Sequence, residues 1–303
     1  MPEISVVIPT YNRLETLAHV IPTLLAQTLP AGEFEVLVCD SNSTDGTAEY
    51  LAGVHADRPN VRHLPGPYSG RAAARNAGID AARGEVVLFN DADILASPDL
   101  LEQHLRHHRQ RRNIAVVGLE VQVKDLQEYA YKRDHPEARG SLHKPGRTKL
   151  SWLYFLTGNA SVRRQDLIRV GRFDESFTGY GHEDLELGYR LERAGITIVY
   201  EPRAINYHCQ DIPHDDQKEK MRLAGRSTVR FYRKHPDFAV QLNLGMTPIS
   251  LGLHSVLEHV PGVLAFFDAR STRSKFARDL VQQYYYVSGV KDALKDDSVG
   301  QRG

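Results

Sequence analysis

The chain has 303 residues, of which 41% are hydrophobic and 25% are charged, so it is long enough to bury one large core or a core with a smaller extension. Lysine plus arginine and aspartate plus glutamate each number 38, and this balance argues against a nucleic-acid-binding protein. The two cysteines, Cys39 and Cys209, are too few for a disulfide framework or a cysteine metal site, which fits the reducing cytoplasm.

The sequence predicts no secretion signal and no membrane-spanning helix. The apolar stretch Ile4 to Pro9 is only as long as a strand and follows no charged segment. We therefore expect a cytoplasmic protein, with at most a peripheral contact at the inner face of the membrane. The most apolar later stretch, 248–267, is interrupted by four residues that do not suit a bilayer core: His254, Glu258, His259 and Pro261.

Strands and amphipathic helices alternate along the first half of the chain. Such alternation predicts an α/β fold in which a mostly parallel sheet carries helices on both faces. In chain order we expect a strand over 4–9, a helix over 15–27, a strand over 34–39, a helix opened by 43–46, a strand over 61–64, a helix over 71–82, a strand over 85–89, a helix over 98–110 and a strand over 114–121.

The second half of the chain is less regular. The polar stretch 125–149 contains two prolines and two glycines and predicts a long loop, and loops of this length are often functional lids. A short segment at 158–162, a loop over 171–181, a helix over 182–194 and a strand over 196–200 follow, and from 215 onward the pattern is helical.

Two carboxylates, Asp91 and Asp93, follow the apolar run 85–89 with one residue between them. We expect them where a buried strand reaches the carboxyl edge of the sheet, because open α/β sheets bind ligands there. Two hard oxygen donors at that edge can hold a divalent cation, and the cation can neutralise a diphosphate. The alternative interpretation is a pair of turn or helix-capping residues.

Four more sequence strings accompany this pair in a characteristic order. They are SVVIPTYNR at 5–13, DSNSTDGT at 40–47, ARNAG at 74–78 and GYGHEDLEL at 179–187. Together with the acidic pair they make residues 3–208 resemble the family 2 glycosyltransferases, which have the Rossmann-like GT-A fold. The resemblance implies a nucleotide-sugar-binding catalytic domain over 1–214, and it leaves 215–303 as a helical C-terminal extension for acceptor, dimer or membrane contacts.

The resemblance also implies a reaction. A sugar would pass from a nucleoside diphosphate donor, with UDP-sugars favoured, to an acceptor hydroxyl by an inverting single displacement. A divalent metal, Mn²⁺ or Mg²⁺, would stabilise the departing diphosphate. The acceptor is left open between a glycan, a lipid-linked molecule and a small molecule.

By the resemblance, the donor nucleotide is bound by residues that follow the first two strands. The carboxylate of Asp40 can accept hydrogen bonds from a base, although an Asx-turn cap is an equal alternative. The string Ser41 to Ser43 departs from the commoner Asp-Gly-Ser at this place and leaves the base open. The other residues expected here are Pro9, Thr10, Tyr11 and Asn12.

The resemblance assigns Asp91, with Ala92, to the donor ribose and Asp93 to the metal. His208 stands where GT-A enzymes often have a metal-binding histidine, and imidazole suits Mn²⁺ better than Mg²⁺. A lone histidine is otherwise usually structural. Arg71 and Arg75 lie one turn apart near a helix start, where the dipole disfavours cations, so we expect a charged ligand near Arg71. Two solvated arginines are the alternative.

Glu183 and Asp184 stand at the predicted start of a helix, where acids are common for dipole reasons alone. The resemblance selects Asp184 as the general base that takes the proton of the acceptor hydroxyl, and Glu183 would orient the acceptor or the base. The remaining residues expected to contact sugar or acceptor are Gly179, Tyr180, Gly181 and Trp152, with core packing as the alternative for Trp152.

A histidine cluster and the C-terminal helices have structural explanations as well. His104, His107 and His108 have helical spacing, but the surrounding arginines predict a solvated basic face. The apolar faces at 256–267 and 284–286 predict core packing or a homodimer contact. The alternative is a peripheral membrane surface for a lipid-linked acceptor, which the basic run 270–278 favours.

Two other functions remain as alternatives. A nucleotidyltransferase would carry a glycine-rich, lysine-containing phosphate loop after the first strand, and Pro9 to Arg13 is not such a loop. A non-catalytic sugar-binding or nucleotide-binding scaffold would not need Asp91, Asp93 and Asp184 together.

Overall fold

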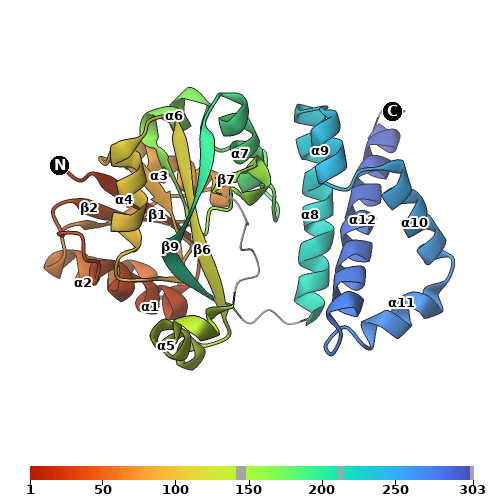
Figure 1. Cartoon of the computed structure of the whole chain (residues 1–303), viewed down its shortest axis with the longest axis horizontal. Helices are drawn as coiled ribbons and strands as arrows, with labels where there is room; N and C mark the ends of the chain where they lie inside the picture. Colours follow the sequence, from red (N-terminus) through yellow and green to blue (C-terminus); the bar gives the residue numbers. More distant parts are fainter. Residues whose placement is uncertain (141–147, 211–213, 301–303) are drawn as a thin grey trace. The chain divides into compact units, whose positions relative to one another are not determined.

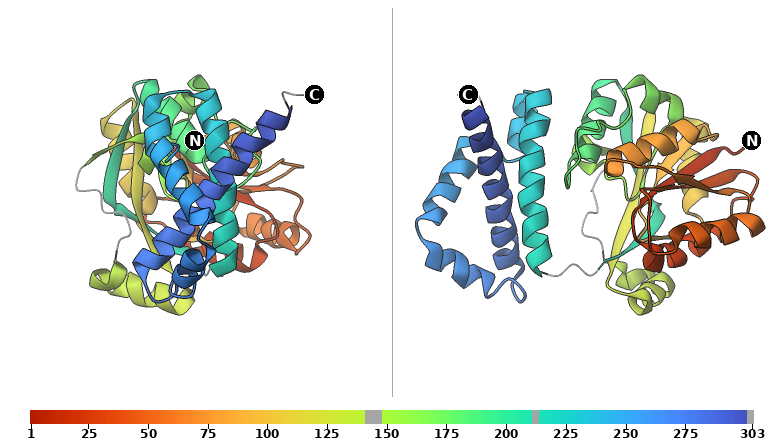
Figure 2. Two further views of the ribbon diagram at one scale, coloured as in Figure 1. Left: turned by 90° about the vertical axis from the view of Figure 1, so that its right-hand side faces the viewer. Right: turned by 180° about the vertical axis from the view of Figure 1, so that it is seen from behind.

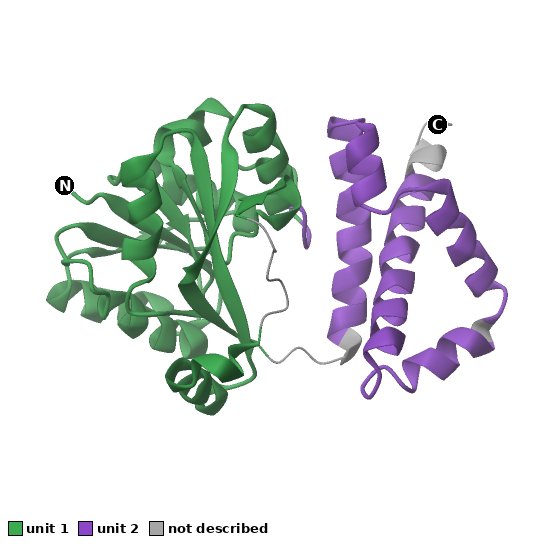
Figure 3. Ribbon diagram, viewed as in Figure 1, with its two compact units in different colours: residues 1–178, 183–211 green, residues 179–182, 212–303 purple. Residues whose placement is uncertain are grey.

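The computed structural model describes residues 1–140, 148–210 and 214–300 (Figure 1). The chain forms two compact units, shown in different colours in Figure 3. Unit 1 consists of residues 1–178 and 183–211, and unit 2 consists of residues 179–182 and 212–303. The division into a catalytic domain ending at 214 and a helical extension stays a prediction about what the two parts do.

The described residues of unit 1 form a nine-stranded sheet in the order β3-β2-β1-β4-β8-β6-β9-β5, with β7 also paired to β9. The β1–β2, β2–β3, β1–β4 and β6–β9 pairs are parallel, and β8, β5 and β7 pair antiparallel with their neighbours. The strands are β1 (Ile4–Thr10), β2 (Phe34–Asp40), β3 (Val61–Pro65), β4 (Val86–Phe89), β5 (Ile94–Ala96), β6 (Ile114–Val123), β7 (Lys149–Leu150), β8 (Ala160–Arg163) and β9 (Thr197–Cys209).

Every residue of β1 and β2 is buried, as expected for parallel strands with helices on both sides (Figure 2). The apolar residues of α1 recur at Leu17, Val20, Ile21 and Leu24 and are all buried. The helical segments of unit 1 are α1 (Leu14–Leu25), α2 (Thr47–Asp57), α3 (Arg71–Ala81), α4 (Leu100–Gln110), α5 (Leu126–Asp134), η1 (Pro136–Arg139), η2 (Trp152–Tyr154), α6 (Arg164–Arg169) and α7 (Glu183–Arg193). The expected fold class, a mostly parallel α/β sheet with helices on both faces, is confirmed.

The predicted loop over 125–149 is wrong in its first half. It contains α5 and η1, and the side chain of Asp125 caps α5 by accepting a hydrogen bond from the Glu128 amide at 2.7 Å. No residue of α5 is buried, so the segment lacks the apolar stripe that would have revealed a helix. Residues 141–147 of the predicted loop lie outside the described residues.

Strand β9 continues to Cys209 and does not end at 200 as predicted. Its pairing with β6 shifts register after Glu201 and resumes at Ile205, so residues 202–204 bulge out of the ladder. Pro202 cannot donate a hydrogen bond to a strand ladder, so the sequence pattern predicted that the strand ends before it. His208 therefore lies inside a strand.

The predicted solvated histidine face on α4 is wrong for His104 and His108, which are buried. Both rings reach the Ser161 hydroxyl, at 2.8 and 2.9 Å, and His104 also bonds the side chain of Asn159. Burial lowers the pKa of His104 to about 4 and that of His108 to about 3, so both are neutral near pH 7. Their partners lie on or beside β8, which the sequence does not place next to α4.

Unit 2 is helical in its described residues. Gly225 of α8 and Gly289 of α12 lie where the two helices cross, because a Cβ on either would overlap a backbone carbonyl of the other helix. A small core of Val229, Met246 and Val290 lies beside this crossing. The helices are α8 (His214–Lys234), α9 (Phe238–Asn243), α10 (Pro248–Glu258), α11 (Pro261–Asp268) and α12 (Lys275–Gly300).

Among the residues that the structure describes, no single helix has the length and apolar composition to cross a bilayer. The helical stretch 238–258 and the following 262–268 reach that composition only together, and they meet at a bend of 98°.

The close packing of α3 on the sheet yields a stability prediction. A Cβ on Gly78 would overlap the side chain of Val7 and lie 2.9 Å from the sulfur of Cys39. We expect Gly78→Ala to lower the free energy of unfolding by about 1–3 kcal/mol because the core must shift. Gly53→Ala is the matched control, since a Cβ there meets nothing within 4 Å, and it should stabilise α2 by roughly 0.5–1 kcal/mol. Urea unfolding of both variants is the measurement; equal changes would contradict the packing argument.

Candidate active site

The carboxyl ends of β1, β2 and β4 meet at one edge of the sheet. Thr10 and Asp40 are register partners at the ends of β1 and β2. Strand β4 lies on the other side of β1 and ends at Phe89, two residues before Asp91. The topology thus brings these three strand ends together at the edge where open α/β sheets bind ligands.

The loops after β1 and β2 are hydrogen-bonded to each other. The Asn12 amide donates to the Ser43 hydroxyl and the Thr44 amide donates to the Asn12 side chain, both at 2.8 Å. Asn12 has φ +50°, a left-handed conformation that asparagine tolerates. Beside it, the Tyr11 ring is 61% exposed, and the hydroxyl oxygen of buried Thr10 has no hydrogen-bond partner. The paired loops form a rigid support with one unused buried hydroxyl.

Asp40 is almost completely buried and has three hydrogen-bond contacts. One carboxylate oxygen accepts from the amide and hydroxyl of Ser43, at 3.0 and 2.5 Å, and the other lies 3.1 Å from His63 Nε2. The contact with the Ser43 amide spans three residues, which is the pattern of a capping side chain and not the two-residue Asx turn that the sequence left open. A carboxylate has about four acceptor positions, so these contacts leave room for one more donor.

Asp91, Ala92 and Asp93 form the turn between β4 and β5. The side-chain amide of Asn90 donates to the carbonyls of Asp91 and Ile94, both at 2.9 Å, and fixes the turn. Ala92 is buried. The turn therefore holds both carboxylates in place through backbone contacts.

Arg75, on α3, joins this turn to the start of α7. Its guanidinium is 1% exposed and donates to Asp91 Oδ1 at 2.8 Å and to Glu183 Oε1 at 3.0 Å. Arg71 lies one turn earlier and contacts the same oxygen of Glu183 at 3.2 Å. The alternative of a solvated arginine is thus wrong for Arg75, whereas the Arg71 side chain is 42% exposed and pairs with Glu183 at its edge.

The two arginines also set the charge of Asp91. Burial raises the pKa of this carboxyl, but Arg75 and then Arg71 outweigh burial and hold the pKa below its ordinary value. Asp91 is therefore an anion near neutral pH.

Asp184 lies next to Glu183 at the start of α7 and behaves differently. Burial first, and the neighbouring Glu183 carboxylate second, raise the pKa of Asp184 to about 7. Glu183 itself is 4% exposed, and its second oxygen, Oε2, has no hydrogen-bond partner. The site thus contains one carboxyl held ionised and another that titrates near neutrality, a separation that often accompanies acid–base chemistry.

Asp93 and His208 are brought together by the antiparallel pairing of β5 with β9. The Cys209 amide donates to the Asp93 carbonyl at 2.9 Å, and Nε2 of His208 lies 3.6 Å from Asp93 Oδ1. The other ring nitrogen, Nδ1, lies 3.1 Å from Glu120 on β6. Burial lowers the pKa of His208, but the neighbouring carboxylates of Asp93 and Glu120 outweigh burial and raise the pKa to about 10.

Sequence reasoning missed Glu120. It is the one charged residue in β6, where Gln122 is also polar and the rest is apolar or glycine, and its charge was the available signal. Gly158, two residues before β8, leaves room for the Glu120 carboxylate, because a Cβ at this position would overlap it.

In the part of the chain that the structure describes, no three His, Cys, Asp or Glu side chains are arranged to hold a metal ion. Asp93 and His208 are a pair. Bond lengths of about 2.0–2.2 Å put two ligands of one ion roughly 3–3.6 Å apart, and the separation of 3.6 Å between Asp93 and His208 is at the upper end of that range. The pair thus fits an ion whose remaining ligands come from elsewhere.

The residues expected to contact sugar belong to two units: Trp152 to unit 1, and Gly179, Tyr180 and Gly181 to unit 2. Trp152 is 5% exposed and packs edge-on against Tyr189 at 5.8 Å, which favours the core-packing alternative. Gly179, Tyr180 and Gly181 group with the helices of unit 2, where the Tyr180 carbonyl accepts a hydrogen bond from Ser227 at 3.0 Å.

Solved structures share this fold. Mannosyltransferase PcManGT from Pyrobaculum calidifontis, in complex with GDP-Man and Mn²⁺, aligns with a TM-score of 0.67 and 20% identity, covering 97% of this chain and 88% of that one. S. aureus TarS 1–349, in complex with UDP, aligns with a TM-score of 0.57 and 20% identity, covering 99% and 92%. Their likeness confirms the expected GT-A fold.

Curated relatives are similar in sequence. Validoxylamine A glucosyltransferase from Streptomyces hygroscopicus subsp. jinggangensis is 31% identical over an aligned length of 280 residues, and the match covers 82% of this chain. The uncharacterized glycosyltransferase YfnE from Bacillus subtilis is 30% identical over an aligned length of 253 residues, and the match covers 67% of this chain. The matches span 64% of the length of each of these two relatives.

Family models match most of unit 1. The model described as an N-terminal domain of galactosyltransferase matches residues 142–214, and the model of glycosyl transferase family 2 matches residues 5–171. Since the match to the family 2 model covers more than half of the chain, the chain belongs to glycosyl transferase family 2.

Proposed function

We propose that the chain is a glycosyltransferase that moves a sugar from a nucleoside diphosphate donor to an acceptor hydroxyl. The observation that carries the proposal is the pair of carboxyls with opposite pKa shifts, Asp91 and Asp184, linked through buried Arg75 and Glu183. Family membership and the glucosyltransferase name of a relative support the reaction class.

The donor nucleotide would bind at the ends of β1 and β2. The unpartnered hydroxyl of Thr10 supports this placement, because a buried hydroxyl without a partner gains a hydrogen bond when a ligand arrives. The exposed ring of Tyr11 offers a face on which a base can stack. Pro9, Asn12 and Asp40 complete this subsite, and Asp91 would bind the ribose hydroxyls. A UDP-sugar is the donor that the family resemblance favours.

A divalent cation, Mn²⁺ or Mg²⁺, fits the pair of Asp93 and His208. Mg²⁺ and similar ions are typically held by one or two protein carboxylates together with substrate phosphates, which agrees with a site of two protein ligands. When bound, the ion would neutralise charge on the leaving diphosphate. Glu120 would accept a hydrogen bond from Nδ1 of His208 and so turn Nε2 toward the ion.

Asp184 would act as the general base. Its carboxylate takes the proton of the acceptor hydroxyl while the acceptor oxygen forms a bond to the anomeric carbon. The bond from that carbon to the phosphate oxygen breaks, and its electron pair leaves with the nucleoside diphosphate. One displacement of this kind inverts the anomeric configuration. Glu183, held by Arg71 and Arg75, keeps the start of α7 at the site and keeps the pKa of Asp184 high.

The activity can be tested by release of nucleoside diphosphate from UDP-, GDP- and dTDP-sugars with Mn²⁺ or Mg²⁺. We expect metal-dependent release from one donor, and its loss in Asp93→Ala and Asp184→Asn. Glu49→Gln, an acid on α2 outside the site, is the control that should keep activity. If the protein releases nucleoside diphosphate from none of these donors and calorimetry also detects no nucleotide binding, the transferase proposal fails. The non-catalytic scaffold would then be the favoured alternative.

Asp184 yields a pH prediction with two signs. As the base it must be deprotonated, so kcat should rise with pH through an ionisation near pH 7. Its raised folded-state pKa means that the folded protein binds the proton more tightly than the unfolded chain does, so stability falls as pH rises from about 4 to about 7.

Asp184→Asn removes this titration. The variant should therefore lose turnover by about 10²-fold or more yet gain thermal stability over wild type at pH 8, with little difference at pH 4. Melting curves at the two pH values are the check. A variant that is less stable at pH 8 would mean that Asp184 has a structural role.

The role of Glu120 can be tested without turnover. We expect Glu120→Ala to weaken Mn²⁺ binding by about 10–100-fold, because His208 loses the group that orients its ring. Glu128→Ala removes a carboxylate on α5 that pairs with Lys132 instead and is the matched control. Electron paramagnetic resonance of free Mn²⁺ in a titration gives the affinity of each variant. Equal Mn²⁺ affinities of Glu120→Ala and Glu128→Ala would contradict the role assigned to Glu120.

A further inference from the structure

Helix α10 of unit 2 carries an exposed apolar stripe. The stripe consists of Ile249, Leu253, Val256 and Val260, whose exposed fractions are 83%, 61%, 62% and 47%. Their spacing of three and four residues puts Ile249, Leu253 and Val256 on one face of the helix, and Val260 follows two residues after the helix ends. Large apolar side chains this exposed and this regularly spaced mark an interaction surface.

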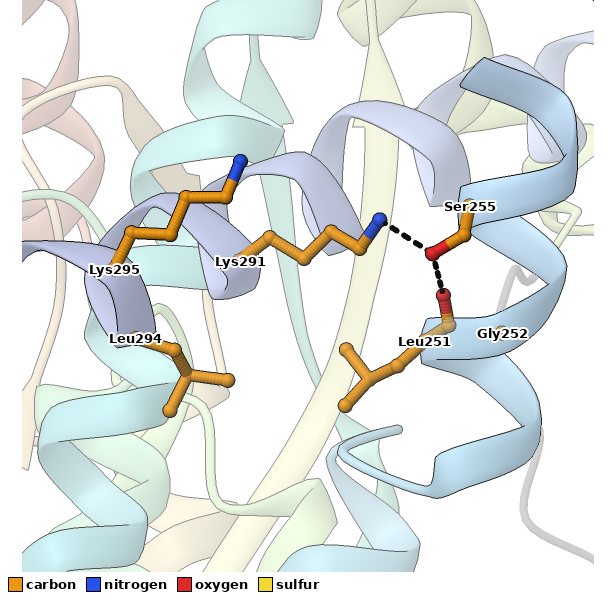
Figure 4. A pocket seen from close by; sticks show the side chains of 6 residues that line it. All are labelled: Leu251, Gly252, Ser255, Lys291, Leu294 and Lys295. Atoms are coloured by element: carbon orange, nitrogen blue, oxygen red, sulfur yellow. Dashed lines mark hydrogen bonds between the residues drawn. The ribbon is translucent and has the colours of Figure 1, made fainter. Parts of the chain in front are cut away.

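The opposite face of α10 is already packed on α12. His254 is buried, with its ring bonded to Ser288 at 2.8 Å and stacked on Tyr284 at 4.4 Å. Figure 4 shows the edge of this packing, where Lys291 donates to the Ser255 hydroxyl at 2.8 Å. The contacts fix the rotation of α10, so the stripe faces away from α12.

Apolar character continues through α11. From 248 to 267, Glu258 is the only acidic or basic residue apart from histidine, and its carboxylate pairs with Lys291 at 2.7 Å. Phe266 of α11 is 50% exposed. Because the packed face of α10 is already paired with α12, its exposed apolar face needs a second apolar environment.

Basic residues border this apolar region. Residues 269–278 contain three arginines and one lysine and no acid. Arg270 lies over the ring of Phe266, with its guanidinium carbon 3.6 Å from the ring centre. The cation and the exposed ring are therefore neighbours. Of the other cations, Arg273 and Lys275 are exposed, and Lys275 pairs with Asp279.

We propose that α10 and α11 dock on an anionic phospholipid bilayer, with the stripe in the interfacial region and the basic residues 270–278 on lipid phosphates. Apolar residues on one face beside clustered cations are the pattern of helices that lie in a membrane surface. Helix α10 has 11 residues, or roughly 16 Å of length, against the roughly 30 Å of a bilayer core, so it would lie on the membrane and not cross it. An anionic lipid surface complements the four cations of 269–278, whereas a second copy of this chain would bring the same cations to the contact.

The test is co-sedimentation of the full chain with vesicles of phosphatidylcholine alone or mixed with phosphatidylglycerol. We expect binding to the mixed vesicles that weakens as salt rises. Ile249→Glu and Leu253→Glu, each at an exposed position, should lower the partition coefficient by about tenfold or more. Ile168→Glu on α6, an apolar residue 46% exposed in unit 1, is the matched control and should bind like the wild type.

A second pair of variants tests the charges. Arg273→Gln with Lys275→Gln should reduce binding to mixed vesicles and flatten its salt dependence. Arg111→Gln with Arg112→Gln removes two exposed cations after α4. This control should change neither the binding to mixed vesicles nor its salt dependence.

Two results would overturn the proposal. The first is equal sedimentation with and without mixed vesicles. The second is a dimer in lipid-free solution, seen by light scattering, that Leu253→Glu converts to monomer, because the stripe would then be a contact between two copies. No donor or acceptor is present in these measurements, so their failure leaves the proposed transferase activity untouched.

Discussion

The site depends on one buried cation. Arg75 is 1% exposed, and its guanidinium connects the turn after β4 with the start of α7, where Glu183 stands 108 residues after Arg75 in the chain. Removing a guanidinium from water is unfavourable, and carboxylates on two sides with charge-assisted hydrogen bonds offset that cost. A side chain that joins two distant segments in this way fixes their relative position better than packing alone.

The same cation explains why neighbouring acids differ. Asp91 and Glu183 contact it directly, whereas Asp184 lies next to Glu183 and feels chiefly burial and a like charge. Short-range geometry therefore sorts three carboxyls of similar chemistry into two that pair with arginine and one with a raised pKa. An acid–base group can be prepared in this way without a histidine.

Much of this could be predicted from the sequence. Strands such as β1 and β2 are uninterrupted apolar runs, and their burial on both faces follows from that pattern. The placement of Asp91 after a strand follows equally from local spacing. The order of five motifs was needed to connect these local features to a family.

Other features depend on contacts that local sequence does not encode. The burial of His104 and His108 requires knowing that β8 inserts between β4 and β6. Glu120 becomes meaningful only when the register of β6 and β9 puts it beside His208. Helix α5 has no buried residue, so no periodic signal was available. Each of these errors comes from tertiary pairing or from its absence, not from a misread propensity.

The pairing of β9 has a consequence for solubility. One edge of β9 pairs with β6. The other edge pairs with two short strands, with β5 at 206–208 and with β7 at 198–199. The outermost strands on this side are therefore only three and two residues long. A long open edge would offer a row of unpaired amides and carbonyls to another molecule, whereas edges this short offer little template. The arrangement that brings Asp93 to His208 thus also protects the sheet against edge-to-edge aggregation.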